Sequence, residues 1–447
     1  MRTERRMHNV RRIALIMVFG WAPSLVFAGD LIPTPEFADH AIPVSIPPAP
    51  EDMSWEWLNV LILIGALGLA SYFALVNRSR RSLFLLAIAS LIWFGFVRDG
   101  CVCPIGATQN VAYSTTDSGY AIPATIVLLF ALPLVFTLFF GRTFCGAVCP
   151  LGAIQEVVAV RSVRVPTWID HGLGMIPHVY LGAAVIFAVS GTAFVICRYD
   201  PFVAIFRMSG DVNMLVFGAC LLLLGLFVGR PYCRYLCPYG AILGVLSKGS
   251  KWHAKIAPED CIQCRLCEDA CPYGAIQEPA LPLVPQGKPA ARRRLAGMLL
   301  LVPVLIAVGI GLGMLLAGSL SRMDPDVRLA EQIRGEETGQ VTEMTDASEA
   351  FRGTGQPISE LYAIAVQRRA RFRTLGGWLG AWTGLVIGLK LVTLCIRRKR
   401  TDYQPDRSRC VSCGRCYRYC PGEQVRLGLI RDVSEMVPDV KDAGSTA

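Results

Sequence analysis

Charge is scarce in this sequence. Lys, Arg, Asp and Glu make up 17% of the 447 residues, whereas hydrophobic residues make up 53% and the mean hydropathy is +0.45. The sequence also lacks a P-loop, a dinucleotide-binding fingerprint, a hydrolase triad signature and the Cys-x2-Cys-His run that attaches c-type haem. These absences argue against the common soluble enzyme classes, because a chain of this length with so little charge is too apolar for an ordinary soluble protein.

Apolar runs long enough, or nearly so, to cross a bilayer as helices occur seven times after the first 56 residues. They lie at about 57–77, 82–98, 121–140, 174–197, 212–229, 295–317 and 375–396. The sequence therefore predicts an all-α polytopic membrane protein with about seven transmembrane helices.

The N-terminus has the features of a secretory signal. A basic start, MRTERRMHNVRR, leads into the apolar run IALIMVFGWAPSLVFA, which ends at the small residue Ala28. We expect a cleavable signal peptide or, because the apolar run is long, an uncleaved N-terminal anchor. In either case the Pro-rich segment that follows, 29–56, is expected to be exported.

Two identical cysteine runs begin about 150 residues apart, at Cys261 and Cys410. Each has the spacing Cys-x2-Cys-x2-Cys-x3-Cys-Pro, which holds a [4Fe–4S] cluster in bacterial ferredoxins, where the fourth cysteine ligates the other cluster of a pair. A zinc site or a disulfide pair does not explain two identical runs that each end in Cys-Pro. The sequence predicts two [4Fe–4S] clusters, with the ligands Cys261, Cys264, Cys267, Cys271, Cys410, Cys413, Cys416 and Cys420.

A second set of cysteines lies in an internal repeat. The repeat pairs GRTFCGAVCPLGAI, with Cys145 and Cys149, with GRPYCRYLCPYGAI, with Cys233 and Cys237. Residues four apart on a helix share one face, so two such CxxxCP pairs facing each other would present four thiolates. That geometry suits a further cluster, a bound metal or a redox disulfide pair, and a purely structural turn is the alternative.

Basic residues predict the topology. Arg78, Arg80 and Arg81 follow the first span, which the positive-inside rule places in the cytoplasm. Counting spans from there puts the ferredoxin runs and the CxxxCP pairs on the cytoplasmic face, where reducing conditions keep thiolates available for iron. The predicted outer loop 318–374 disagrees, because it contains four arginines beside a span. They are Arg368, Arg369, Arg371 and Arg373.

Three further cysteines are expected on the outer face. Cys101 and Cys103 form a degenerate copy of the motif, and Cys197 ends the fourth predicted span. They could form a redox site or ligate a further cofactor, or they could equally form a disulfide and leave a spare thiol. Cys220 and Cys395 lie within apolar helices and are expected to be core residues.

Glycines in the last two spans predict a helical hairpin. Small residues recur at Gly309, Gly311 and Gly313 in one span and at Gly380, Gly384 and Gly388 in the other, which is typical of helices whose backbones approach closely. Such a hairpin would return the second ferredoxin run to the first, so that Cys420 closes the site of Cys261, Cys264 and Cys267. The alternative is that these glycines are merely tolerated in membrane helices and mark no close contact between them.

The predicted organisation follows from these segments. It comprises a signal peptide or anchor (1–28), a periplasmic Pro-rich segment (29–56), a five-helix membrane domain with both CxxxCP motifs (57–254), the first ferredoxin motif and linker (255–294), a transmembrane helix (295–317), a periplasmic loop (318–374), a transmembrane helix (375–396), and the second ferredoxin motif with the C-terminal tail (397–447).

These motifs resemble those of the NosR/NapH-type membrane polyferredoxins over roughly residues 80–280. The resemblance rests on GRTFCGAVCPLGAIQE, CRYDPFVAIFR, GRPYCRYLCPYGAI and the first ferredoxin run. It implies an iron–sulfur electron-transfer subunit of the bacterial cytoplasmic membrane, not a stand-alone enzyme, that links the quinone pool or a cytoplasmic donor to a periplasmic respiratory reductase. The exported flavin-binding domain of NosR-type members is missing, and two spans separate the ferredoxin runs, so a NapH-like or generic polyferredoxin role remains.

Two other functions stay open at this point. One is a metal-reducing assembly factor resembling CcoG-type polyferredoxins, and the other is a redox-sensing regulator that signals through 318–374. Because a hydrocarbon core of about 30 Å separates the two faces, electron transfer across it also needs a carrier such as quinone, flavin or a cluster at the outer cysteines. Gln155, Glu156 and His178 are weak candidates for a quinone headgroup or for proton transfer. The net charge of +10 needs no nucleic-acid partner.

Overall fold

A computed structural model describes residues 53–436 with short gaps at 99, 101–103, 117–118, 121, 161–162, 192–193, 208–211, 257–260, 281–287, 342–343 and 397–399. The predicted signal or anchor, almost all of the Pro-rich segment, and both Cys101 and Cys103 therefore lie outside the described residues.

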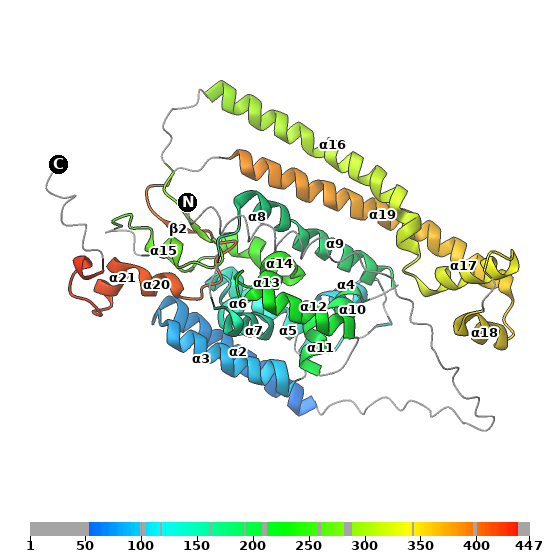
Figure 1. The fold of residues 1–447 in the computed structure, drawn as a ribbon, viewed down its shortest axis with the longest axis horizontal. Helices are drawn as coiled ribbons and strands as arrows, with labels where there is room; N and C mark the ends of the chain where they lie inside the picture. Colours follow the sequence, from blue (N-terminus) through cyan, green and yellow to red (C-terminus); the bar gives the residue numbers. More distant parts are fainter. Residues whose placement is uncertain are drawn as a thin grey trace, which may run out of the picture. The chain divides into compact units, whose positions relative to one another are not determined.

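The described chain is almost entirely helical (Figure 1). The first half contains α2 (Met53–Leu75), α3 (Arg80–Ser90) continued by the π-helical η1 (Leu91–Val97), α4 (Pro104–Ser114), α5 (Ala124–Phe140), α6 (Thr143–Ala147), α7 (Pro150–Val158), α8 (Thr167–Leu173), α9 (Ile176–Val189), α10 (Val195–Tyr199), α11 (Pro201–Arg207), α12 (Val212–Gly225), α13 (Pro231–Tyr235), α14 (Pro238–Leu246) and η2 (Ser247–Gly249). The second half contains α15 (Leu266–Asp269), β1 (Ile276–Gln277), α16 (Lys288–Ser321), α17 (Pro325–Glu337), α18 (Asp346–Gly353), α19 (Ile358–Cys395), β2 (Gln404–Pro405), α20 (Arg415–Tyr419), α21 (Pro421–Arg426) and η3 (Val433–Glu435).

Within the described residues, five helices are long and apolar enough to cross a membrane. They are α2, α3 with η1, α8 with α9, α16 and α19, and the bent pair α11–α12 makes a sixth if it counts as one span. These helices support a multi-pass membrane protein, but not all of the seven predicted continuous spans. The predicted span 121–140 is the 17-residue helix α5, and 174–197 is interrupted after Val189.

Prolines explain why the membrane part contains short helices. The helices α4, α7, α11 and α14 begin at Pro104, Pro150, Pro201 and Pro238. Proline suits the first position of a helix, where no intrahelical partner exists for a backbone N–H, and its ring disfavours helical backbone in the residue before it. The chain therefore turns before each proline, and a hydropathy profile does not reveal such a turn.

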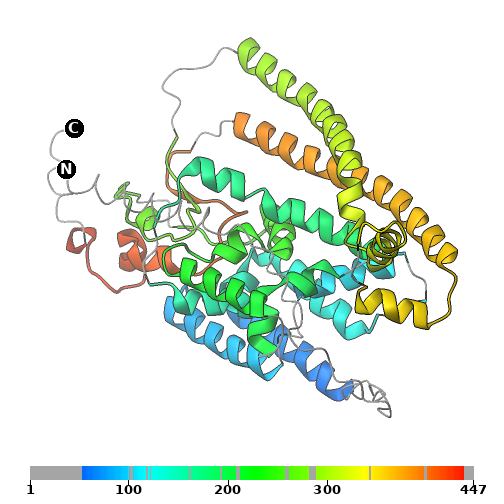
Figure 2. The same ribbon diagram turned by 45° about the vertical axis from the view of Figure 1, so that its right-hand side comes forward.

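The predicted glycine hairpin is confirmed. Figures 1 and 2 both show α16 and α19 side by side along most of their length. A Cβ at Gly309 or Gly313 would overlap the backbone of α19, and one at Gly380 or Gly384 would overlap that of α16. Only glycine allows the two backbones to come this close. Gly311 differs, because a Cβ there would meet nothing within 4 Å.

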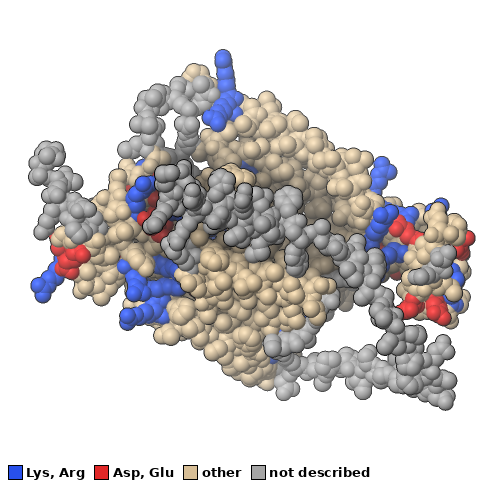
Figure 3. All heavy atoms as spheres, in the orientation of Figure 1, with Lys and Arg blue, Asp and Glu red and all other residues tan. Residues whose placement is uncertain are grey.

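The predicted loop 318–374 is instead largely helical. It contains α17 and α18, and α17 packs its Val327, Ala330 and Ile333 against α19. Two of the arginines that conflicted with the charge rule have acidic partners there: Arg368 lies 3.8 Å from Asp324, and Arg369 lies 2.8 Å from Glu331. Figure 3 shows charged side chains gathered over α17–α18 and over the ferredoxin segments, with uncharged surface between them.

A two-stranded sheet joins the two ferredoxin segments. β1 pairs with β2 in antiparallel register, with Ile276 opposite Pro405 and Gln277 opposite Gln404, and an isolated bridge joins Ala280 to Arg400. The residues after the first cysteine run are therefore hydrogen-bonded to the residues before the second.

Candidate functional site

The first cysteine group surrounds a largely apolar cavity. Cys271 of the first run lines this cavity together with Cys410, Cys413 and Cys416 of the second. Aromatic and aliphatic side chains complete the lining, and they include Tyr273, Ile276 and Tyr417. Three cysteines therefore come from one run and the fourth comes from the other.

The second cysteine group has the reverse composition. Cys267 interacts electrostatically with Cys261 and Cys264 of its own run and with Cys420 of the other. Cys267 is buried, and Cys261 and Cys420 pack against the same apolar cluster. The structure thus brings together the eight cysteines of the ferredoxin runs in two groups of four, in the interleaved arrangement that the sequence predicts. We call these groups the ferredoxin-type groups.

Both cysteine runs have the same unusual backbone conformation. The residue before the second cysteine has positive φ in each run (Gln263, 53°; Ser412, 54°), and so does the residue after it (Arg265, 66°; Gly414, 75°). Positive φ is uncommon outside glycine, so its recurrence at equivalent positions shows that both loops curl in the same way. The curled loop turns successive cysteines toward one centre.

Burial strongly affects these thiols. The pKa values of Cys267 and Cys410 are raised to about 12, mainly by burial and in smaller part by neighbouring cysteines. Such thiols hold their protons at neutral pH unless a metal displaces them, because cysteine binds metals as the thiolate.

The four CxxxCP cysteines form a third group, which we call the repeat group. Cys237 interacts electrostatically with Cys233 of its own pair and with Cys145 and Cys149 of the other. Cys145, Cys149 and Cys237 are buried and Cys233 is partly buried, and burial raises the pKa of Cys233 to about 11. The two pairs therefore face each other, as the repeat predicts.

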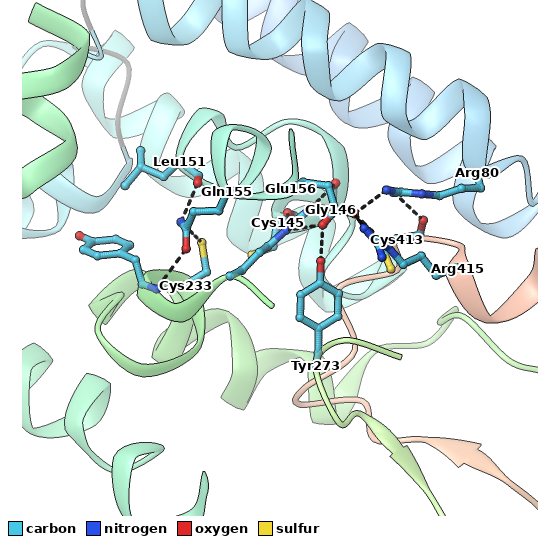
Figure 4. Close-up of polar contacts among 12 residues, drawn as sticks. Arg80, Cys145, Gly146, Leu151, Gln155, Glu156, Cys233, Tyr273, Cys413 and Arg415 are labelled. Atoms are coloured by element: carbon cyan, nitrogen blue, oxygen red, sulfur yellow. Dashed lines mark hydrogen bonds and ion pairs between the residues drawn. The ribbon is translucent and has the colours of Figure 1, made fainter. Parts of the chain in front are cut away.

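Hydrogen-bond donors point at the sulfur atoms of the repeat group. The Gln155 side chain donates from Nε2 to Cys233 Sγ at 3.3 Å (Figure 4), and the backbone N–H of Gly240 donates to Cys237 Sγ at 3.2 Å. Arg142 Nη2 lies 3.7 Å from Cys145 Sγ. Donors of this kind stabilise a thiolate or a negatively charged thiolate complex.

Two buried arginines cross between the copies of the repeat. Arg142 of the first copy has its Nη2 3.4 Å from where a Cβ of Gly240 would lie, and Arg230 of the second has its Nη1 3.0 Å from where a Cβ of Gly152 would lie. Each glycine stands two residues after the proline of its CxxxCP motif, so each copy leaves space for the arginine of the other. This exchange locks the two cysteine pairs together.

Glu156 is the centre of a buried ion-pair network (Figure 4). Its carboxylate lies 3.1 Å from Arg230 Nε and 2.7 Å from Arg415 Nη2, pairs with Arg80, and accepts a hydrogen bond from the Tyr273 hydroxyl at 2.5 Å. Burial alone would raise the pKa of Glu156, but the three guanidinium groups hold it well below its usual range. Glu156 therefore stays ionised and joins the repeat to both ferredoxin segments.

The second ferredoxin run lies directly on the repeat. A Cβ at Gly146 in α6 would overlap the carbonyl oxygen of Val411. Arg142 Nη1 donates to the Ser408 carbonyl at 2.8 Å, and Arg80 Nη1 donates to the Cys413 carbonyl at 3.1 Å. The loop that bears Cys410 and Cys413 is thus in backbone contact with the helix that bears Cys145.

The remaining predicted residues have other surroundings. Cys197 is exposed, and its Sγ lies 3.3 Å from where a Cβ of Gly106 would lie, while Cys101 and Cys103 are outside the described residues. Cys220 is not a core residue as expected, because it is exposed on α12, and Cys395 is partly buried. His178 offers its backbone carbonyl to Trp382 Nε1 at 2.7 Å.

The sequence interpretation missed the arginines of the site. It used Arg80 only to orient the chain, and it gave Arg142, Arg230 and Arg415 no role in a site. A signal for two of them was present, since both copies of the repeat begin with Gly-Arg and place the arginine three residues before the first cysteine.

The described residues contain no set of three or more Cys, His, Asp or Glu side chains that could hold a metal ion. The donor sets fit a larger anionic group, because each consists of four cysteines and the repeat group adds a buried guanidinium. A [4Fe–4S] cluster uses four thiolates in this way.

Comparison with protein families agrees with these groupings. Models described as a 4Fe-4S binding domain match residues 122–167 and 211–256, which contain the two CxxxCP motifs, and also residues 254–277 and 407–426, which contain the ferredoxin runs. The chain therefore contains 4Fe–4S binding domains in both its repeat and its ferredoxin segments.

Two curated proteins are similar over part of the chain. YccM of Escherichia coli (strain K12), named as an electron transport protein, is 31% identical over 25% of this chain and 34% of its own length. NirI of Paracoccus denitrificans (strain Pd 1222) is 33% identical over 27% of this chain and 18% of its own length. The matches thus span about a third or less of these relatives. No solved structure matches the chain.

Proposed function

We propose that this chain is a membrane-bound electron-transfer protein with three [4Fe–4S] sites, which links the quinone pool or a cytoplasmic donor to an exported respiratory reductase. The observation that supports this most strongly is the backbone contact between Gly146 and Val411, because it joins the repeat group to a ferredoxin-type group without intervening side chains. Similarity to YccM, which is named for electron transport, agrees with it.

The two ferredoxin-type groups are the proposed ligand sets of two clusters. One set is Cys261, Cys264, Cys267 and Cys420, and the other is Cys271, Cys410, Cys413 and Cys416. A cluster held by four thiolates takes up and releases one electron at a time. The protein contributes the curled loops, the apolar lining and the sheet between β1 and β2, which fix the two sets side by side.

The repeat group is the proposed ligand set of the third cluster. A disulfide in either pair would be neutral and would leave the buried Arg142 without a negative partner, since none of the groups that raise its pKa is a carboxylate. An uncompensated buried charge is costly. A cluster with four thiolate ligands is negatively charged, so it supplies the charge that Arg142 lacks.

The chain's own residues keep the sites coupled. Arg80 and Arg415 hold the second ferredoxin run to Glu156, while Arg230 holds Glu156 to the carbonyl groups of Cys145 and Gly146. Glu156 and Arg230 are buried and Arg80 and Arg415 are partly buried, so water has little access to the contact. The network therefore fixes the distance between the repeat group and the adjacent ferredoxin-type group.

The test is iron content and spectroscopy of the full chain purified without oxygen. Three clusters predict about 12 irons per chain. Cys264→Ser and Cys237→Ser should each remove one EPR-active centre, and a different one. Quinol should reduce the remaining centres in membrane vesicles. Full iron and unchanged spectra in Cys237→Ser would overturn the third site, and failure of quinol or any cytoplasmic reductant to reduce the centres would overturn the electron-transfer role.

A further inference from the structure

The two copies of the repeat differ in the charge that faces their buried arginine. Glu156 of the first copy corresponds to Gly244 of the second, because each stands six residues after the proline of its motif. Glu156 pairs with Arg230. At Gly244 a Cβ would lie 3.9 Å from Arg142 Nη1 and 3.3 Å from the Ser408 carbonyl oxygen, so the place of a carboxylate is taken by a neutral backbone group.

Position 244 therefore offers Arg142 no carboxylate, and the positive charge of Arg142 faces the repeat group. Its side chain is 8% exposed, its Nη1 donates to the Ser408 carbonyl, and its Nε has no hydrogen-bond partner. The acidic groups that act on it are Cys145, Cys237 and Cys233. Cys410 of the adjacent ferredoxin-type group also experiences this positive charge.

The carboxylates near the other ferredoxin-type group are instead paired with arginines. Glu423, which lies near Cys420, pairs with Arg78 and Arg426, and Glu268, which follows Cys267, pairs with Arg164. A fixed cation in a low-dielectric site strongly favours the addition of an electron. The buried cation that faces cysteines and not a carboxylate therefore lies at the repeat group.

We infer that Arg142 sets the reduction potential of the repeat group and makes it the electron acceptor of the ferredoxin-type groups. This inference rests on the proposed third cluster and adds a direction to it. One electron leaves the adjacent ferredoxin-type group, which is oxidised, and reaches the repeat group, which is reduced, with no bond or proton exchanged. A one-electron donor on the ferredoxin side supplies the next electron. Arg142 is a positioning residue: it places a positive charge beside the repeat group and does not ligate the cluster.

The experiment is an EPR-monitored redox titration of the full chain, purified without oxygen, in two matched series. In the first, Arg142→Gln removes the charge and Arg142→Lys retains it. In the second, Gly244→Asp adds a carboxylate beside Arg142 while Gly244→Asn adds the same shape without charge. The midpoint potentials of the centres that Cys237→Ser and Cys264→Ser remove are measured separately.

Arg142→Gln and Gly244→Asp should each lower the ratio of reduced to oxidised repeat centre at least tenfold at fixed potential, about 59 mV for one electron. Arg142→Lys and Gly244→Asn should stay close to wild type, and the centre removed by Cys264→Ser should not move. Unchanged potentials in Arg142→Gln or Gly244→Asp would overturn the inference while leaving the third cluster intact. Loss of the repeat centre in Arg142→Gln but not in Arg142→Lys supports it, and loss in both overturns it. A wild-type protein without the centre refutes the proposed function itself.

Discussion

Two pairs of short helices in the membrane part each contain the same kind of buried hydrogen bond but differ in the side chains around it. We call them the α7 pair (α7 and α14) and the α4 pair (α4 and α11). In α7, Gln155 Oε1 accepts from the backbone N–H of Tyr232 at 3.1 Å, and in α4, Gln109 Oε1 accepts from that of Ile196 at 2.8 Å. Both glutamines are fully buried and stand five residues after the proline that begins their helix. Each accepted N–H belongs to the residue just before a cysteine, Cys233 or Cys197.

The pairs differ in the residue before the proline that begins the second helix, Pro238 in α14 and Pro201 in α11. The α7 pair has Cys237 there, whereas the α4 pair has Asp200, whose carboxylate caps α11 by accepting from the N–H of Phe202 at 2.9 Å and also accepts from the Tyr232 hydroxyl at 3.1 Å. Either side chain caps the helix, but only the thiol is a ligand suited to iron–sulfur clusters. The same backbone scaffold therefore holds the proposed ligand Cys237 in one place and a polar link between the two pairs in the other.

The largest expected effect tests this difference directly. Cys237→Ser should remove one cluster, about four of about 12 irons, whereas Cys197→Ser should retain the iron of the repeat group. Iron analysis together with EPR measures both variants. Equal loss of iron in the two would show that the α4 pair also binds a cluster, and the comparison would then fail.

The next effect concerns the buried carboxylates of the two pairs. Glu156→Gln should destabilise the protein by about 3 kcal/mol or more, because three arginines lose their shared counter-charge. The pKa of Glu156 is lower in the folded protein than its usual value of 4.5, so its stabilisation is complete above pH 4.5 and is lost as pH falls further. The difference between variant and wild type should therefore be large at pH 7 and shrink in acid.

Thermal unfolding in detergent across this pH range measures the effect, with Asp200→Asn as the comparison. In the described part of the chain Asp200 forms no ion pair with an arginine, and burial raises its pKa to about 6. Asp200→Asn should consequently destabilise the protein less than Glu156→Gln does. A smaller loss for Glu156→Gln than for Asp200→Asn would contradict the role of the arginine network.

Among the residues that the structure describes, a ferredoxin segment covers the α7 pair, and the glycine hairpin is expected to help hold that segment there. Gly313→Val places a side chain against the backbone of α19 and should cost about 1–3 kcal/mol by overpacking. Gly311→Val is the control, because its Cβ meets nothing within 4 Å. Thermal stability and iron retention should fall in the first variant only, and equal losses would mean that the close approach of the helices is unimportant.

The smallest effect separates coupling from binding. Gly146→Ala should push the Val411 carbonyl away and slow electron exchange between the repeat group and the adjacent ferredoxin-type group, because the two groups would lie farther apart. Iron content should not change. Rapid-reduction kinetics with EPR detection measures the rate, with Gly297→Ala, which has open space around it, as the control.

Much of this architecture could be predicted from local patterns. The two cysteine runs specify their loops through spacing, and the glycines at fixed spacing predict the α16–α19 contact because helical periodicity alone brings them to one face. The interleaved proximity of the eight ferredoxin cysteines could also be predicted, since a cysteine run that ends in Cys-Pro sends its last sulfur to a partner site, and their role as ligands stays a prediction.

Other features were beyond such patterns for physical reasons. The partners of Glu156 come from four separate segments, at Arg80, Arg230, Tyr273 and Arg415, and no periodicity relates residues that far apart. The helix that starts at Ile176 ends at Val189 within an apolar stretch, so hydropathy predicts a continuous span at 174–197. The helices within 318–374 are too polar for a span and were therefore expected as a loop.

The interleaving of the ferredoxin-type groups has a consequence for biosynthesis. Each group takes cysteines from both runs, so neither can be complete before the second run has been synthesised. The second run also follows α19, which has to be in place beside α16 before the two runs can meet. A chain stalled before Cys410 would accordingly have no finished ferredoxin-type group to fill, and we expect these groups to be filled only after α19 has been inserted.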